Sequence, residues 1–518
     1  MDPQFKFSQP GEVRVRFAPA PSGKLHIGGA RTALFNYLFA KKYNGVFVLR
    51  IEDTDVERSK PEFEKEIMES LKWLGIEWDE GPDVGGNYGP YRQSERREIY
   101  KKYIEKLLQE NKAYYCFCTK EELEAQRQYQ LSIGEPPRYT GKCRNLSEDT
   151  VKKYLEMGKP YVIRFKVEGK EIEFEDLIRG KIRFDARLIG DFVIAKNFQS
   201  PLYNFACVVD DFEMRITHVI RAEDHISNTP KQILLQKAFG FYHPQYAHLP
   251  LILAPDRSKL SKRHGATAVS DFRKMGYLPE ALVNFMALLG WNPGGDREFF
   301  SMSSLIKEFS LEKVQKSGAV FNIKKLDFFN GFYIRQKSLD TLTNLCIPYL
   351  IEAGLIEPLK ETTQKFLISE TKEIIALETL QKIVSLYQQR LKKLSEIVSL
   401  TDFFFKKSLE YEKGLLKWKE MSEKEILQSL ERSEAVISKI KKEEWNKENL
   451  EKILMEQASK FSAEIGKEPG DRGYLLWPLR VALTGKEASA GPFEIAEVLG
   501  KEKTVQRLKE AKEKLKNP

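Results

Sequence analysis

Two short motifs contain the residue types that hold a nucleoside triphosphate. The first is His-Ile-Gly-Gly at residues 26–29, and the second is Lys-Leu-Ser-Lys-Arg at residues 259–263. Glycines let a base or a phosphate approach the backbone, and an imidazole can donate to a phosphate oxygen. Converging cations suit a triphosphate whose leaving pyrophosphate gathers negative charge. Each motif alone has a simpler interpretation: a glycine-rich turn with a surface histidine, or a solvated basic loop.

The segments around the first motif predict a strand–helix–strand unit that positions it. Apolar residues at 13, 15 and 17 alternate with polar or small ones, which predicts a half-exposed strand. The apolar face after Gly28 predicts a helix that Asn44-Gly45 ends. Residues 46–51 predict a buried parallel strand, with Glu52 directly after it. In such a unit, functional residues lie at the carboxyl ends of the strands.

The sheet pattern returns before the second motif. Residues 202–211 and 216–220 predict two further strands, and Arg221 follows the second of them. Thr229 and Pro230 then predict the start of a helix, with a capping residue and a proline in its first turn. The region between the two halves differs in character, so it predicts an insertion into the nucleotide-binding domain.

Composition limits the class of protein. A chain of 518 residues predicts several domains, and 42% hydrophobic with 31% charged residues predicts a globular protein. The net charge of +9 permits a polyanionic partner without requiring one. No apolar run approaches the roughly 18 residues of a membrane span. Five cysteines argue against a disulfide scaffold, which predicts a cytoplasmic location.

Several longer strings resemble bacterial glutamyl-tRNA synthetases, which are class I aminoacyl-tRNA synthetases. They include RFAPAPSGKLHIGGARTALFNYLFA, LRIEDTD, GPYRQSERR, LYNFACVVDDFEMRITHVIRAEDH, KLSKRHGA, FNIKKLDFFNG and LLWPLRVALTG. The resemblance implies an α/β chain with a Rossmann-type nucleotide-binding catalytic domain, an inserted acceptor-binding domain, a helical stem-contact domain and an all-α anticodon-binding region. The implied ranges are 12–95 and 203–229 for the catalytic halves, 96–202 for the insertion, 230–335 for the stem-contact domain and 336–518 for the anticodon-binding region.

The resemblance implies a glutamate–tRNA ligase. ATP and glutamate would form glutamyl-adenylate with Mg²⁺ and release pyrophosphate, and the glutamate would then pass to the 3′ end of tRNA(Glu). Such catalysis consists mostly of positioning and charge stabilisation, so it needs no protein nucleophile. The catalytic residues carried over are His26, Lys259 and Lys262. The ATP site carried over comprises His26, Gly28, Gly29, Asp224, Lys259, Lys262 and Arg263.

A glutamate pocket follows from the same resemblance. Its residues are Arg16, Ala18, Ala20, Glu52, Tyr203, Cys207 and Arg221. A guanidinium binds a carboxylate bidentately, so Arg221 is the expected partner of the substrate side chain and Arg16 a second candidate. Glu52 would meet the ammonium group, although an ordinary ion pair between Arg16 and Glu52 is the alternative. Ala20 and Cys207 stand where some relatives have serine and asparagine.

Three cysteines resemble the zinc site that some bacterial members carry in the insertion. They are Cys116, Cys118 and Cys143, and thiolates hold Zn²⁺ tetrahedrally. Tyr139, four residues before the last cysteine, is the predicted fourth ligand, with Asn145 or water as alternatives. The competing interpretation is three unliganded thiols.

The resemblance places tRNA contacts along the chain: the acceptor end at the insertion, the inner corner of the tRNA after Pro230 and the anticodon at the C-terminal helices. Relatives that reject tRNA(Gln) use an arginine at the third anticodon base. Residues 438–441, our placement of that position, contain no arginine, with Arg390 as an alternative candidate. Our hypothesis is a non-discriminating monomer that also charges tRNA(Gln).

Three other functions explain less of the sequence. A tRNA-binding paralogue without catalysis would not need His26, Lys259, Lys262 and Arg221 together. A shortened ligase that glutamylates a tRNA base lacks the helical C-terminal region. A nucleotidylyltransferase for a small acid leaves roughly 250 residues unexplained.

Overall fold

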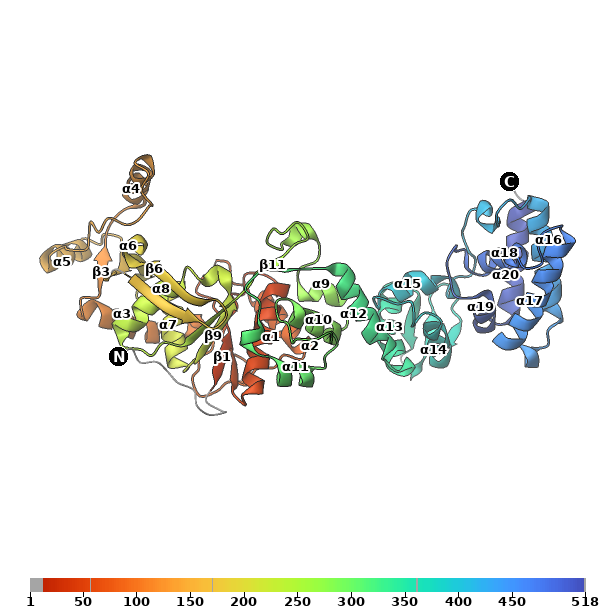
Figure 1. Cartoon of the computed structure of the whole chain (residues 1–518), viewed down its shortest axis with the longest axis horizontal. Coiled ribbons are helices and arrows are strands. Elements are labelled where there is room, and N and C mark those ends of the chain that lie inside the picture. Colours follow the sequence, from red (N-terminus) through yellow and green to blue (C-terminus); the bar gives the residue numbers. More distant parts are fainter. Residues whose placement is uncertain (1–12, 56, 170, 360–361, 517–518) are drawn as a thin grey trace. The chain divides into compact units, whose positions relative to one another are not determined.

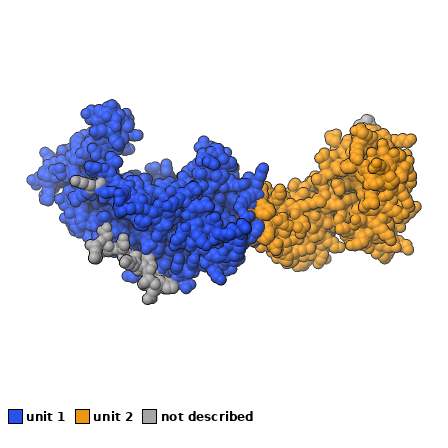
Figure 2. All heavy atoms as spheres, viewed as in Figure 1, with its two compact units in different colours: residues 1–273, 279–326 blue, residues 274–278, 327–518 orange. Residues whose placement is uncertain are grey.

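The computed structural model describes residues 13–55, 57–169, 171–359 and 362–516, without the side chain of Lys262. These residues form two compact units (Figure 2). The first runs from the start of the described chain to Arg273 and includes Pro279–Leu326. The second comprises Lys274–Leu278 and the chain from Asp327 onward. Among the described residues, no helix combines the length and apolar character of a membrane span.

The predicted strand–helix–strand unit is confirmed at the start of the first unit (Figure 1). Strands β1 (Arg14–Phe17) and β2 (Val46–Leu49) are parallel neighbours, joined by helix α1 (Ile27–Lys42). Apolar side chains of α1 such as Leu34 and Leu38 are fully buried. Burial of this helix face against the sheet stabilises the unit and fixes the loop that carries His26.

A second group of strands extends this core. Strands β9 (His218–Ala222), β10 (Gln245–Leu249) and β5 (Glu171–Asp176) are parallel neighbours, and β6 (Gly180–Asp185) adds to β5 antiparallel. Strand β1 lies beside β9, since the Thr217 amide donates to the Arg14 carbonyl at 2.8 Å. The carboxyl ends of β1, β2 and β9 therefore meet, and β5 brings part of the predicted insertion into the same sheet.

One predicted strand is wrong. Residues 202–211 do not form a strand, because helix α7 occupies Tyr203–Glu213. The segment is almost continuously apolar, and such a run does not distinguish a buried strand from a buried helix. Phe205, Val208 and Val209 are all buried at helical spacing, and Asp211 lies on the same helix. The β1 prediction holds, but its Arg16 is 4% exposed rather than on a solvent face.

The helix predicted at Thr229 is α8 (Thr229–Phe239), with Pro230 in its first turn. Its N-cap is Asn228, whose side chain makes no capping hydrogen bond, so the prediction that Thr229 caps the helix is wrong. The Thr229 hydroxyl instead accepts a hydrogen bond from Arg221. Gly240 ends the helix with a left-handed φ of 72°, which glycine adopts without strain.

The rest of the insertion forms a separate antiparallel sheet with helices at its edge. The strand order is β3-β4-β7-β8. The elements are β3 (Ala113–Cys116), α4 (Lys120–Ser132), α5 (Glu148–Glu156), β4 (Val162–Phe165), α6 (Ala186–Ile189), β7 (Phe192–Asn197) and β8 (Ser200–Pro201).

The remaining elements of the first unit are mostly helices, with two short strands, β11 (Ile252–Leu253) and β12 (Ala319–Val320), that pair in parallel. The helices include α2 (Pro61–Trp73), α3 (Arg97–Gln109), η3 (Lys262–His264), α9 (Val269–Lys274), α10 (Pro279–Leu288), α11 (Met302–Glu308) and α12 (Ile323–Arg335), the last of which continues into the second unit.

The second unit is helical apart from one small sheet, so the prediction of an all-α region needs correction there. Strands β13 (Ile356–Leu359), β14 (Thr362–Ile368) and β15 (Ile374–Ala376) pair antiparallel. Phe366 and Ile368 of β14 are buried at strand spacing, a signal that the helix-based prediction missed. The helices are α13 (Leu339–Glu352), α14 (Leu377–Ser385), α15 (Glu396–Thr401), α16 (Glu423–Lys439), α17 (Lys447–Glu464), α18 (Gly473–Thr484), α19 (Pro492–Leu499) and α20 (Lys501–Lys516).

A buried histidine on β9 makes the stability of the first unit sensitive to acid. Burial lowers the pKa of His218 to about 4, below its usual value of 6.5. The unfolded chain therefore binds a proton that the folded chain rejects, so stability is lost as pH falls below 6.5. Between pH 7 and 5 this histidine is expected to cost about 2 kcal/mol.

Chemical denaturation at both pH values checks this expectation. A His218→Gln variant should lose about 2 kcal/mol less than the parent chain between pH 7 and 5. Equal losses in the two proteins would show that His218 does not cause the acid sensitivity.

Candidate active site

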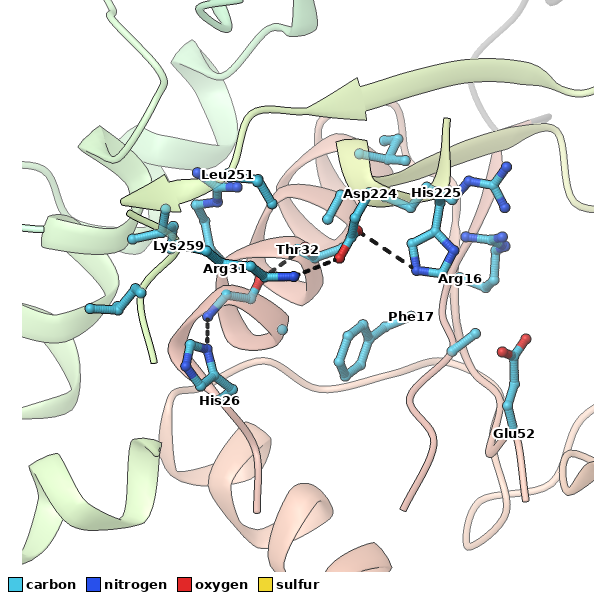
Figure 3. Close-up of a pocket in the computed structure, with 18 of the residues that line it drawn as sticks. Arg16, Phe17, His26, Arg31, Thr32, Glu52, Asp224, His225, Leu251 and Lys259 are labelled. Carbon is cyan, nitrogen blue, oxygen red and sulfur yellow. Dashed lines mark hydrogen bonds and ion pairs between the residues drawn. The ribbon is translucent and has the colours of Figure 1, made fainter. Parts of the chain in front are cut away.

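A cavity of about 560 Å³ lies at the carboxyl ends of β1, β2 and β9 and the start of α1 (Figure 3). The predicted site residues that line it are Arg16, Ala18, His26, Gly28, Gly29, Glu52, Tyr203, Arg221, Asp224 and Lys259. In Figure 3, His26 and Lys259 lie on one side of the cavity, and Arg16 and Glu52 lie on the other. The sequence-predicted nucleotide and amino-acid residues thus share one cavity, with His26 and Lys259 across it from Arg16 and Glu52.

Other predicted residues do not line this cavity. Ala20 is exposed in the loop after β1. Cys207 is buried behind the wall, with its Sγ 3.9 Å from Nη2 of Arg16. Arg263 is exposed and donates to the Ser261 hydroxyl at 3.3 Å. Lys262 lies in η3, and its side chain is outside the described structure.

The start of α1 presents hydrogen-bond donors to the cavity. His26 is the N-cap residue of α1, and its Nδ1 accepts the amide of Gly28 at 3.1 Å. An accepting Nδ1 places the proton of the neutral ring on Nε2, where it can donate to an anion. A Cβ built on Gly28 would contact only this Nδ1, at 3.4 Å, so protein packing alone does not demand glycine there. The helix N-terminus itself favours a phosphate.

Lys259 brings a cation to the same end of the cavity. Its Nζ lies 3.0 Å from Oδ2 of Asp224, and the Lys259 side chain is 63% exposed. An ion pair this exposed contributes little stability, so the lysine can exchange it for a phosphate. Burial raises the pKa of Asp224, but the hydrogen bond and the positive charge of Lys259 oppose this, and the net pKa is lowered.

A network of buried charges forms the opposite end. Arg16 donates from Nε to Oδ1 of Asp211 at 3.1 Å, and Arg50 donates to the same oxygen at 2.8 Å. Arg50 also pairs with Glu52 at 3.1 Å. Burial alone would raise the pKa of Asp211, but the two guanidinium groups lower it to about 2. The alternative prediction of an Arg16–Glu52 pair is therefore wrong, because each residue has a different partner.

Arg221 differs from these two arginines. Its guanidinium donates to three neutral acceptors: Nε2 of His248 at 3.2 Å, the Thr229 hydroxyl at 2.8 Å and the Tyr203 hydroxyl at 3.5 Å. It is 5% exposed and, among the described residues, no carboxylate lies within ion-pair distance of it. A buried cation without a protein counter-ion is costly, so the site is built to receive an anion.

Sequence reasoning missed several residues of this wall. Arg50 and Asp211 hold Arg16 and Glu52, and His225 lines the cavity with its Nδ1 3.0 Å from the Tyr203 hydroxyl. Burial and the nearby Arg221 lower the pKa of His225 to about 4, so its ring is neutral at pH 7. An arginine at the end of an apolar strand was a usable signal for Arg50. Asp211 was hidden by the wrong strand prediction for residues 202–211.

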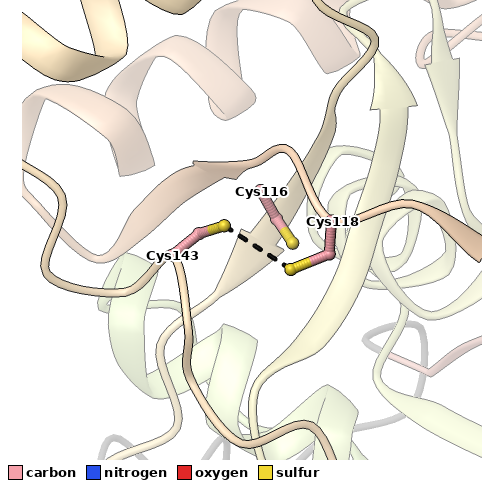
Figure 4. Close-up of side chains that lie close together, drawn as sticks. All are labelled: Cys116, Cys118 and Cys143. Atoms are coloured by element: carbon pink, nitrogen blue, oxygen red, sulfur yellow. Dashed lines mark hydrogen bonds between the residues drawn. The ribbon is translucent and has the colours of Figure 1, made fainter. Parts of the chain in front are cut away.

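The predicted metal ligands come together in the insertion (Figure 4). The sulfurs of Cys116, Cys118 and Cys143 all lie within 4.8 Å of one another. The Tyr139 hydroxyl lies 3.4 Å from Sγ of Cys116 and 3.5 Å from Sγ of Cys118, whereas Asn145 is exposed. Burial and the neighbouring thiols raise the pKa of Cys118 to about 12. A bound divalent cation would favour the thiolate form of these cysteines, and three sulfurs with a hydroxyl beside them fit Zn²⁺.

Comparison with known proteins agrees with this architecture. The family model for the catalytic domain of class I tRNA synthetases (E and Q) matches residues 12–328, and an anticodon-binding domain model matches residues 341–512. The glutamate–tRNA ligase 1 of Caldicellulosiruptor saccharolyticus is 51% identical over 96% of this chain and 98% of its own. The glutamate–tRNA ligase of Carboxydothermus hydrogenoformans is 47% identical over 96% of this chain and 99% of its own.

A solved structure extends the similarity to the fold. The crystal structure of a glutamate tRNA ligase from Elizabethkingia meningosepticum, in complex with its amino acid, aligns with a TM-score of 0.82 at 36% identity. The alignment covers 97% of this chain and 99% of that one. The chain therefore belongs to the glutamate–tRNA ligase family of class I tRNA synthetases.

Proposed function

We propose that the chain activates L-glutamate with ATP and transfers it to the 3′ end of tRNA(Glu), forming AMP and diphosphate. The observation that carries this proposal is the buried guanidinium of Arg221, whose protein partners are all neutral. It shares one cavity with His26 and Lys259, which suit a triphosphate. A site with an anion acceptor at one end and phosphate donors at the other fits an acidic amino acid and ATP.

In the first step, the glutamate α-carboxylate attacks the α-phosphorus of ATP, and the bond to diphosphate breaks. The Nε2–H of His26 and the ammonium of Lys259 stabilise the negative charge on the phosphate oxygens. Gly28, Gly29 and Asp224 would contact the nucleotide, and Lys262 and Arg263 would add charge to the loop. Mg²⁺ would neutralise part of the triphosphate charge, as is typical of the family.

The part of the cavity lined by Arg221 would bind glutamate through its side-chain carboxylate and through its ammonium group. Arg221 would bind the side-chain carboxylate, with the Tyr203 hydroxyl beside it. Glu52 would accept from the ammonium group, because Arg50 holds its carboxylate at the edge of the cavity. Arg16 would add positive potential, with Ala18, Ala20 and Cys207 shaping the surroundings. In the second step, a terminal hydroxyl of the tRNA displaces AMP from the adenylate.

The proposed domain functions follow the predicted ranges. Residues 96–202 would hold the acceptor end, 230–335 the inner corner of the tRNA and 336–518 the anticodon, with 12–95 and 203–229 as the catalytic halves. We propose a monomer, and a cytoplasmic location because no disulfide joins its five cysteines. Light scattering should then give a mass near 60.0 kDa.

Charging of purified tRNA(Glu) tests the proposed function. The chain, ATP, Mg²⁺ and labelled glutamate should yield acid-precipitable label together with AMP and diphosphate. Omission of ATP is the control and should abolish the product. Absence of charging by folded protein, with a known ligase active on the same tRNA, would contradict the proposal.

We also propose a structural Zn²⁺ held by Cys116, Cys118, Cys143 and the hydroxyl of Tyr139. Metal analysis of protein prepared without chelator should find about one zinc per chain. A Cys143→Ser variant should lose the metal, whereas Cys346→Ser, at a buried thiol in the second unit, should retain it. Zinc-free parent protein would contradict this site.

The non-discriminating hypothesis stays a proposal of the same kind. Residues 438–441 span the end of helix α16 at Lys439, while Arg390 donates to the Ser489 carbonyl at 2.6 Å. If no arginine rejects tRNA(Gln) at its third anticodon base, labelled glutamate should appear on purified tRNA(Gln) as well as on tRNA(Glu). Charging of tRNA(Glu) alone would overturn this hypothesis without affecting the ligase activity. The Arg390→Ala variant would then test whether Arg390 rejects tRNA(Gln), since its loss should allow tRNA(Gln) to be charged.

A further inference from the structure

A chain of buried polar groups lies directly behind Arg221. Oδ2 of Asp176 lies 2.6 Å from Nδ1 of His248, and Nε2 of His248 accepts from Nε of Arg221 at 3.2 Å. The exposed fractions of Asp176, His248 and Arg221 are 1%, 0% and 5%. We call these three residues the buried triad.

The sheet determines this arrangement. His248 on β10 and Arg221 on β9 are directly paired positions of parallel strands, so their side chains leave the same face. Asp176 ends β5, which pairs with β10 on its other side. A strand of the insertion therefore supplies the carboxylate that reaches the catalytic sheet.

The hydrogen bonds of Asp176 determine the tautomer of His248. The carboxylate accepts the amides of Ile178, Arg179 and His248 at 3.0, 2.9 and 3.0 Å. Burial raises the pKa of Asp176, but the hydrogen bonds from His248 and these amides outweigh burial. The net pKa is lowered, so the carboxylate is ionised. An ionised carboxylate only accepts, so Nδ1 of His248 must donate and Nε2 must accept.

The imidazole stays neutral between a carboxylate and a guanidinium. The charged and titratable groups that face it are Asp176, Arg221, Arg179, His225 and the stacked Tyr246. Burial and the two arginines lower the pKa of His248, and Asp176 opposes them without reversing the direction. The ring therefore presents a lone pair to Arg221 at pH 7.

This geometry orients a cation without neutralising it. Arg16 is held by direct contact with the carboxylate of Asp211, which compensates its charge. Arg221 is held by Nε2 of His248 and the hydroxyl of Thr229, so its charge remains available. The difference matters for selectivity, because an uncompensated guanidinium favours a carboxylate over a carboxamide of the same shape.

We propose that Asp176 and His248 are positioning residues that orient Arg221 for the substrate side-chain carboxylate and preserve its preference for glutamate over glutamine. This inference rests on the proposed function, in which Arg221 binds that carboxylate. Neither residue touches the substrate.

Three variants test the proposal through the tRNA-charging reaction. Asp176→Asn lets an amide donate to Nδ1, which moves the ring proton to Nε2 against Arg221. His248→Leu removes the acceptor, whereas His248→Gln offers a carbonyl oxygen near the position of Nε2. We expect the first two to raise the KM for glutamate about 10- to 100-fold, with the KM for ATP unchanged, and the third to recover part of the loss.

His218→Gln is the matched control. It replaces a different buried imidazole, on β9, which does not line the cavity. It should leave the KM for glutamate unchanged. If Asp176→Asn and His248→Leu leave the glutamate KM and the preference for glutamate over glutamine unaltered, the positioning role is overturned while the ligase function stands. Failure of the parent chain to charge glutamate would instead overturn the proposed function.

A second measurement needs no catalysis and can be made on the parent protein. In ¹⁵N-histidine-labelled parent protein, which has six imidazoles, the His248 ring should be neutral at pH 7 with its proton on Nδ1. Its signal is assigned as the one that disappears in His248→Gln, or from its through-space contacts to the stacked Tyr246 ring. A His248 protonated at Nε2 would contradict the proposal.

Discussion

Replacing Arg221 with leucine is expected to lower kcat/KM for glutamate by about 10²–10³-fold, since removal of one partner of a buried charge pair costs about 2–5 kcal/mol. The glutamate carboxylate would then enter a buried pocket without its counter-charge. The loss should appear mainly in the KM for glutamate, with the KM for ATP unchanged. Steady-state charging of tRNA(Glu) at varied glutamate and varied ATP measures both.

The same substitution should leave the fold intact. Arg221 has no carboxylate partner among the described residues, so its removal strands no anion. The Thr229 hydroxyl lies 3.0 Å from Nε2 of His248 and can satisfy it. Arg221→Lys, which keeps the charge but loses the planar fork, should fall between the parent and leucine. Arg187→Ala, at an exposed arginine of α6, is the control and should leave the KM for glutamate unchanged. Full activity of Arg221→Leu would refute the assignment.

Replacing Asp211 with alanine should destabilise the first unit by about 3–5 kcal/mol, the usual cost of breaking a buried ion pair. Asp211 neutralises both Arg16 and Arg50, and its pKa of about 2 shows how strongly they favour its ionised form. Without it, two buried guanidinium groups would repel one another. Denaturant unfolding at pH 7 measures the loss.

The matched control is Asp271→Ala. Asp271 pairs with Lys24 at 3.1 Å, but both side chains are exposed, so its loss should cost less than about 1 kcal/mol. Asp211→Ala should also impair glutamate use, because Arg16 and Arg50 hold the wall of the cavity. An Asp211 variant as stable as the Asp271 variant would show that the buried network does not support the fold.

Local sequence patterns predicted the elements whose burial has a clear period. The alternation at residues 13–17 and the helical face after Gly28 correspond to β1 and α1, and both motifs lie where the predicted sheet would place them. Residues 202–211 were mistaken for a strand because both faces of α7 are buried, which removes the helical period from the sequence.

The partners of the charged residues were less predictable, because they depend on tertiary contacts. Arg16 and Asp211 are separated by 195 residues, and Asp176 and His248 by 72. No spacing rule links such positions. Residue types alone pointed to the two phosphate motifs, whereas the glutamate-binding residues were predicted only through the family resemblance, which did not predict Arg50, Asp211 or Asp176.

The selectivity of the parent chain between glutamate and glutamine tests the central claim most directly. With purified tRNA(Glu) and ATP, kcat/KM should favour glutamate by at least about 10³-fold, because the site is built around an uncompensated guanidinium. The two substrates have nearly the same shape, so the comparison isolates the charge that we propose Arg221 binds. Comparable charging with glutamine would contradict the account, since Arg221 would then not select the substrate.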